Sequence, residues 1–238
     1  MLRTAGLTSA EYARSGFGQL VTVTVLTLIV LAVAAHVAAR DTVADRVWLR
    51  GLLGGLAVLT LVIVASALSR MWAYEQAYGF THLRLLVSVF EIWLGVVFVL
   101  VMAAGVRLRA RAAWLPGAVL GAAVISLLGL AVLNPDRFIA ERNVVRFAET
   151  TYIDLYYLED LSADAVPALD RLPEPWRVCV LDKINGELDR TEPGEEWRHW
   201  NLGRSEARRV LGDYTSPYTP PFTAGVPPCP ALDWSNSP

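Results

Sequence analysis

Residues 82–106 read HLRLLVSVFEIWLGVVFVLVMAAGV, an apolar run interrupted by only two charged residues, Arg84 and Glu91. An α-helix rises 1.5 Å per residue, so about 20 apolar residues cross the roughly 30 Å hydrocarbon core of a bilayer. A lipid-exposed backbone must satisfy its own hydrogen bonds, and a continuous run lacks the alternation of a barrel strand. The stretch therefore predicts a membrane-spanning helix.

Three further runs have the same character. They cover residues 17–39, 47–68 and 113–133. Together with residues 82–106 they predict an all-α integral membrane bundle of four transmembrane helices, which we place at residues 1–134. The first run is too long for the apolar part of a signal peptide, so we interpret it as the first span.

Capping residues indicate where several helices begin. Thr42, followed by Asp45 three residues later, predicts a start before the second span, and Thr81 precedes the third. Asn134 followed by Pro135 predicts a new helix with Asn134 as its cap. The Thr151 to Asp154 pattern predicts another start by the same rule.

The composition changes after residue 134. Residues 1–134 carry ten arginines against five acids, whereas residues 135–238 carry eleven basic against eighteen acidic residues. We expect a small helical soluble domain over residues 135–212, including a helix from Trp176 to Leu188, and a Pro-rich extended tail over residues 213–238. The acidic balance argues against nucleic acid as a partner, because phosphate binding needs clustered cations.

The arginine loops suggest an orientation. Arg40, Arg46 and Arg50 lie near one loop, and residues 107–112 carry three more arginines on the same predicted side. Once the arginines of the soluble domain are discounted, six on this side compare with four on the other. The positive-inside rule then favours cytoplasmic short loops and an extracytoplasmic C-terminal domain.

No nucleotide-binding, metalloprotease or hydrolase motif is present in the sequence, and the histidines and cysteines lack metal-ligand spacing. We therefore predict no cofactor and favour a non-enzymatic protein of structural, regulatory or sensory type. Its C-terminal domain, which is acidic and aromatic, is a candidate binding surface for a protein partner, and the bilayer is the other partner.

Glu91 is the main candidate for chemistry inside the membrane. A buried acid is costly in lipid, so it must face protein or water. Arg84, Ser88 and Glu91 share one helix face, and Arg70 and Glu75 are candidates for the mouth of the same polar stripe. The alternative to a partner-binding protein is thus a transporter or membrane-embedded enzyme that uses this stripe. A purely structural Glu91 remains equally open.

Cys179 and Cys229 are the only cysteines, and both lie in the soluble part. If that part is extracytoplasmic, an oxidising environment allows a disulfide between them. The bridge would tie the Pro-rich tail to the domain. Two unrelated thiols, with Cys179 buried as a small apolar residue, are the alternative.

Several stretches resemble a bacterial family of polytopic membrane proteins described as a domain of unknown function, 4153/4173. They are residues 6–17, the Tyr74–Arg84 stretch, Asn134–Asp136, Arg142–Asn143, residues 161–169 and Trp200–Leu202. The resemblance implies a multi-pass protein of the bacterial cytoplasmic membrane, with further spans ahead of residue 6 in longer members. It implies no activity, because none is assigned to the family.

Overall fold

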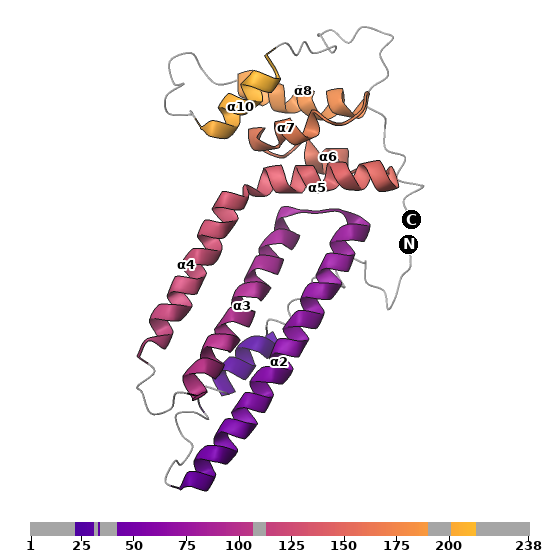
Figure 1. Ribbon diagram of the computed structural model, residues 1–238. Coiled ribbons are helices and arrows are strands. Elements are labelled where there is room, and N and C mark those ends of the chain that lie inside the picture. Colours follow the sequence, from indigo (N-terminus) through magenta and orange to yellow (C-terminus); the bar gives the residue numbers. More distant parts are fainter. Residues whose placement is uncertain (1–21, 31–32, 34–41, 107–112, 190–200, 213–238) are drawn as a thin grey trace. The chain divides into compact units, whose positions relative to one another are not determined.

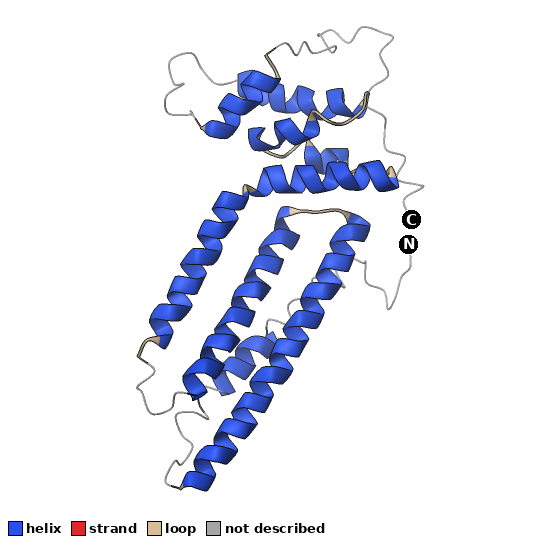
Figure 2. Ribbon diagram, in the orientation of Figure 1, coloured by secondary structure: helices blue, strands red, loops and turns tan. Residues whose placement is uncertain are grey.

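The computed structural model describes residues 22–30, 33, 42–106, 113–189 and 201–212, and all regular elements in these ranges are helical (Figures 1 and 2). In chain order after residues 22–30, they are α2 (Val43–Tyr78), α3 (His82–Val106), α4 (Leu115–Leu133), α5 (Pro135–Thr150), α6 (Leu155–Leu158), η1 (Ala163–Ala165), α7 (Val166–Leu169), α8 (Trp176–Asp189) and α10 (Leu202–Val210). The all-α prediction is confirmed for this part of the chain.

Three helices are long and apolar enough to cross a membrane. They cover Arg50–Tyr78, His82–Gly105 and Leu115–Leu133. These helices correspond to the second, third and fourth predicted runs, so the chain has the helices of a membrane protein. The first predicted span, residues 17–39, lies mostly outside the described residues, although residues 22–30 are helical. A total of four spans therefore stays a prediction.

The helix α2 continues ten residues beyond Leu68, where the predicted span ends, to Tyr78. Residues 69–78 contain no glycine or proline, so nothing in their backbone stops the helix. It ends at Gly79, whose φ of 84° lies in the left-handed region and whose N–H donates to Glu75 O at 2.9 Å. Glycine adopts this conformation at little cost, which explains the position of the stop.

The predicted cap of α2 is confirmed. The backbone N–H of Thr42 donates to the Asp45 carboxylate at 3.1 Å, and the Asp45 N–H donates to the Thr42 hydroxyl at 3.0 Å. This reciprocal pair satisfies two of the donors that every helix start leaves open. Thr81 also accepts weakly from the Arg84 N–H at 3.5 Å, as expected of a cap for α3.

Two other cap predictions were wrong in detail. Asn134 has a left-handed φ of 52° and its side chain makes no cap bond to α5, although Pro135 does open that helix. A side-chain cap normally requires an extended backbone at the cap residue, which this left-handed conformation does not supply. Thr151 terminates α5 with a φ of 62°, whereas Asp154 itself caps α6 by accepting from the Tyr157 N–H at 3.1 Å.

The chain divides into two compact units. Unit 1 contains the residues up to Met71 together with Val87–Leu128, and unit 2 contains Trp72–Leu86 with Gly129–Ser237. In unit 1, fully buried Phe98 packs with Ala57, surrounded by apolar side chains such as Leu53. Much of the remaining apolar surface of its helices is exposed, as for lipid-facing helices.

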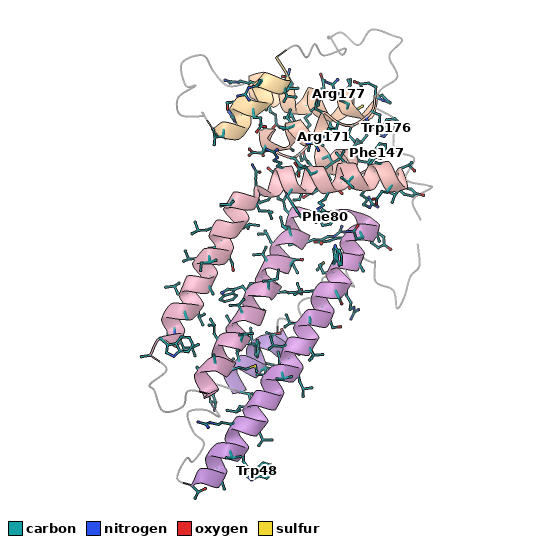
Figure 3. All side chains as sticks on the ribbon, viewed as in Figure 1. Trp48, Phe80, Phe147, Arg171, Trp176 and Arg177 are labelled. Atoms are coloured by element: carbon teal, nitrogen blue, oxygen red, sulfur yellow. The ribbon has the colours of Figure 1, made fainter. Side chains whose placement is uncertain are left out.

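Unit 2 has a larger apolar core. Its fully buried side chains include Ile139 of α5, Val166 and Leu169 of α7, and Val180 and Leu181 of α8. The helices α7 and η1 pack on α5, and α10 covers η1 and α7. Phe80, from the α2–α3 connection, also belongs to this core and meets Phe138 edge-on at 6.0 Å. Figure 3 marks Phe80 and the ring pair of Phe147 and Trp176, whose centroids are 5.8 Å apart.

Gly203 allows a close approach of α10 to the Asp164 side chain of η1. A Cβ at this position would overlap the Oδ1 atom of Asp164. We therefore expect Gly203→Ala to destabilise unit 2 by about 1–3 kcal/mol, the range for overpacking a tight contact. Gly186 on α8 has no atom within 4 Å of a Cβ built there.

The matched control is Gly186→Ala, which should stabilise α8 by about 0.5–1 kcal/mol because alanine is the better helix former. Both effects are measured by denaturant titration of the two variants, with the proteolytic susceptibility of unit 2 as the readout of unfolding. Equal midpoints for the two variants would show that the Asp164 side chain simply swings away from position 203.

Candidate functional site

Side chains of α3, α5 and α6 make several hydrogen bonds to the connection between α2 and α3 and to the helix ends beside it. The backbone of this connection must turn sharply at Gly79, where a Cβ would lie 2.7 Å from Oδ1 of Asn143. Glycine thus serves twice here, because it permits the positive φ and leaves room for the Asn143 amide.

Asn143, a buried residue of α5, binds the peptide groups of this turn. Its Oδ1 accepts from the Phe80 N–H at 3.1 Å, and its Nδ2 donates to Phe80 O at 2.9 Å and to Ile139 O at 3.0 Å. Only a carboxamide offers a donor and an acceptor side by side, so asparagine matches both backbone groups of Phe80.

Two arginines neutralise the carbonyl end of α2. Arg146 donates from Nε to Gln76 O at 3.0 Å and from Nη2 to Ala77 O at 2.6 Å. Arg84 donates from Nη1 to Tyr78 O at 3.2 Å and to Gly79 O. A helix leaves its last carbonyls unpaired and carries partial negative charge there, so two guanidinium groups are favourable partners.

We call Arg84, Asn143 and Arg146 the turn clamp. Burial and the charge of Arg84 lower the pKa of Arg146, yet an arginine stays protonated in proteins and keeps its donors. Arg84 also lies over the Tyr74 ring, 4.7 Å from its centroid. With these contacts the clamp joins the core of unit 2 to the ends of α2 and α3.

A second cluster lies beside the clamp. The Tyr157 hydroxyl accepts from the His82 backbone N–H at 2.7 Å and lies 2.8 Å from Nδ1 of the same residue. The Nε2 atom of His82 contacts the Asp136 carboxylate, which also accepts from the Ser162 N–H at 3.2 Å. With a neutral ring, Tyr157 donates to Nδ1 and Nε2–H donates to Asp136.

The order of hydroxyl, imidazole and carboxylate also occurs in hydrolases. Here, however, the Tyr157 oxygen already holds a backbone N–H, and Asp136 holds another at Ser162. His82 is the accessible member, since 45% of its side chain is exposed against 20% for Asp136. The cluster therefore ties the start of α3 to α5 and α6.

Alkaline pH tests the Tyr157 contacts. Burial is the main cause that raises the pKa of Tyr157 above its ordinary value near 10. The folded protein thus holds this proton more tightly than the unfolded chain, so its contribution to stability is full below about pH 10 and is lost as pH rises beyond that.

We expect unit 2 to lose stability steeply above about pH 10, and Tyr157→Phe to remove that component. At neutral pH the same variant should cost about 1–3 kcal/mol, because the His82 N–H loses its acceptor. Tyr156→Phe, at an exposed neighbour, is the control and should change stability by less than about 0.5 kcal/mol. An unchanged alkaline profile in Tyr157→Phe would contradict the assignment.

The residues of the predicted polar stripe are placed as follows. Glu75 is buried in the last turns of α2, within reach of the Arg84 charge, whereas Arg70 is exposed on the same helix. Glu91 is buried at 3% exposure, and its Oε2 has no hydrogen-bond partner among the described residues. Ser88 is half-buried on α3. Arg84 contacts the carbonyls of Tyr78 and Gly79 and the ring of Tyr74, so its guanidinium group is directed to the turn rather than toward Glu91.

The predicted disulfide is only half described. Cys179 is buried at 7% exposure on α8. Cys229 lies outside the described residues, so the bridge stays a prediction.

Sequence reasoning missed His82, Asp136, Asn143, Arg146 and Tyr157 as site residues. Single polar residues in helical segments look alike in sequence, and the contact between Phe80 and Asn143 joins residues 63 positions apart. The available signal was indirect. Some of the stretches that carry the family resemblance, around Tyr74–Arg84, Asn134–Asp136 and Arg142–Asn143, meet at this site.

The family comparison covers the same residues. A family model described as a domain of unknown function, DUF4153, matches residues 1–172. The chain belongs to the DUF4153 family. The matched part of this DUF4153 protein contains the whole turn clamp and the His82 cluster, and it ends after α7. No curated protein and no solved structure matches the chain.

Proposed function

We propose that this DUF4153 protein is a non-enzymatic membrane protein, structural, regulatory or sensory, whose C-terminal helical unit binds a protein partner. The turn clamp carries this proposal. Its three side chains bind backbone groups of the α2–α3 connection, so their polar atoms serve attachment rather than chemistry. Since α2 and α3 are continuous with the apolar spans, a force on unit 2 reaches the membrane helices.

The surface of unit 2 offers side chains suited to a partner. Tyr156 is 69% exposed and Tyr152 is 52% exposed, both near the α5–α6 connection. Lys183 lies 6.0 Å from the Tyr156 ring and binds the carboxylates of Glu159 and Asp160, at 3.1 and 2.6 Å. These bonds raise the pKa of Lys183. Exposed tyrosines beside fixed charges are typical of protein interfaces.

The location is part of the proposal. The family resemblance favours a bacterial cytoplasmic membrane, and the arginine loops favour an extracytoplasmic unit 2. In that compartment the Cys179–Cys229 bridge forms, and the partner is a periplasmic or extracellular protein.

Photo-crosslinking in cells tests the partner. A photoreactive residue in place of Tyr156 should give a discrete, reproducible protein adduct, and the Asn143→Ala exchange should abolish that adduct. Ile125, which is 70% exposed on the apolar helix α4, is the control position and should label lipid. Only self-adducts or lipid adducts from position 156 would contradict the proposal.

The second candidate is a transporter or membrane-embedded enzyme that uses the Glu91 and Arg84 stripe. The burial of Glu91 within an apolar helix favours it, because intramembrane acids mark ion and substrate pathways. Purified protein in sealed vesicles with a pH-sensitive dye inside distinguishes the two. A proton flux that Glu91→Gln abolishes would favour transport. A proton permeability equal to that of protein-free vesicles would favour the partner-binding protein.

A further inference from the structure

Glu91 is deeply placed within its helix. It lies nine residues after His82 and fifteen before Val106, so it is about 14 Å from one end of α3 and about 22 Å from the other. Its side chain is only 3% exposed, and Oε2 is buried without a hydrogen-bond partner in the described part of the chain. From Val87 to Val106 the helix carries no other charged residue, and the half-buried Ser88, one turn before Glu91, has no hydrogen bond to it.

No cation is paired with this acid among the residues that the structure describes. The other charged residues of unit 1 whose side chains are described are Asp45, Arg50 and Arg70, all on α2. None of the ion pairs in residues 42–106 and 113–189 includes Glu91. Arg84, the nearest arginine along α3, is bound to the carbonyls of Tyr78 and Gly79.

Neutral polar groups of the described residues do not replace a cation either. Thr60, which is also buried in unit 1, donates its hydroxyl to Leu56 O at 2.9 Å within its own helix. The indole Nε1 of Trp93 is a second buried atom without a partner in the described residues. Residues two apart on a helix do not face each other, so the Trp93 donor does not serve Glu91.

An ionised carboxylate in these surroundings is strongly disfavoured. Transfer of an unpaired charge into an apolar medium costs far more than transfer of a neutral, polar group, and such groups neutralise instead. We propose that Glu91 is a proton-binding site within the membrane helices, which holds its side chain as a neutral carboxylic acid at neutral pH. The site takes a proton from water, and releases it when water or a cation reaches the carboxylate. This inference does not depend on a protein partner for unit 2.

Infrared spectroscopy of the full chain in lipid vesicles gives the first test. The C=O stretch of a protonated carboxylic acid lies above the amide band, and that of an ionised carboxylate lies below it. The difference spectrum between wild type and Glu91→Gln at neutral pH should show one protonated band that the variant loses completely. Glu141→Gln, at a half-exposed acid paired with Arg137, should leave the protonated band in place.

Glu91→Asp provides a second variant if glutamine disturbs the bundle. It keeps a carboxylic acid, so the protonated band should shift in frequency rather than vanish. A wild-type spectrum in which the Glu91 signal is that of an ionised carboxylate overturns the proposal, whatever the variants do.

Chemical labelling gives an independent reading. An apolar carbodiimide adds to a protonated acid: the acid proton moves to one carbodiimide nitrogen and the carboxylate oxygen bonds to the central carbon. Where water is excluded, the acyl group of this O-acylisourea then moves from oxygen to nitrogen, which breaks the acyl C–O bond and gives a stable N-acylurea of the same mass. We expect a stable adduct on Glu91, found by mass spectrometry, that is lost in Glu91→Gln and declines as pH rises. A Glu91 that reacts with a water-soluble carbodiimide as fast as Glu141 would be hydrated, and that result would contradict the neutral, buried acid.

Discussion

Leu169→Ala is expected to destabilise unit 2 by about 2–5 kcal/mol, with little effect on the membrane helices of unit 1. Leu169 is fully buried on α7, in the core that α5, α8 and α10 share. Truncation removes three side-chain carbon atoms with their contacts and leaves a cavity, which neighbouring helices fill only in part. A small helical unit has little stability to spare, so much of its folded population would be lost.

Hydrogen exchange of reconstituted protein measures this loss locally. Amides of α8 should exchange roughly thirtyfold faster or more, because each 1.4 kcal/mol is a factor of ten. The matched control is Leu202→Ala, which makes the same chemical change at a side chain that is 74% exposed, and it should shift exchange by less than about threefold. If Leu169→Ala changes the exchange rates as little as Leu202→Ala does, the core of unit 2 does not depend on α7.

The membrane helices were predictable because length and apolarity alone decide them. A run such as residues 115–133 has no charged residue, so lipid leaves it no alternative to a helix. The start of α2 was predictable for a different reason, since Thr42 and Asp45 bind each other's backbone across three residues. Both signals are local, and local signals survive in a single sequence.

The ends of helices that depend on tertiary contacts were not predictable. Asn134 looked like a side-chain cap, but its backbone takes a left-handed conformation and its amide makes no cap bond. The predicted span ended at residue 68, whereas Arg146 and Arg84 bind the last carbonyls of α2 and favour its extension to Tyr78. The contacts of Arg146 join residues about 70 positions apart, and such long-range contacts leave no periodic pattern in the sequence.

The candidate site divides in the same way. Glu91 could be singled out because an acid in an apolar run is unusual by composition alone. Asn143 could not, because one asparagine in an amphipathic helix is usual and its partner Phe80 is an ordinary apolar residue. The role of Asn143 depends on the folded structure, in which its carboxamide binds the N–H and C=O groups of Phe80 in the turn.

Asn143→Ala should therefore cost about 2–5 kcal/mol and release the α2–α3 turn from α5. The Phe80 N–H and C=O both lose their partners in a buried place, and each orphaned group costs about 1–3 kcal/mol. Asn143→Asp should be at least as damaging. It keeps an acceptor for the Phe80 N–H, but sets a second carboxylate oxygen against the carbonyls of Phe80 and Ile139.

Asn201→Ala is the matched control for this exchange. Asn201 caps α10 by accepting from the Arg204 N–H at 2.7 Å in an exposed position, so its loss should cost only about 1 kcal/mol. The hydrogen-exchange rate of the amides at residues 80–85 should rise in Asn143→Ala and stay unchanged in Asn201→Ala. The unfolding temperature of unit 2 should fall further in Asn143→Ala than in Asn201→Ala. If Asn143→Ala leaves those amides protected, the arginines alone hold the turn, and the clamp is smaller than three residues.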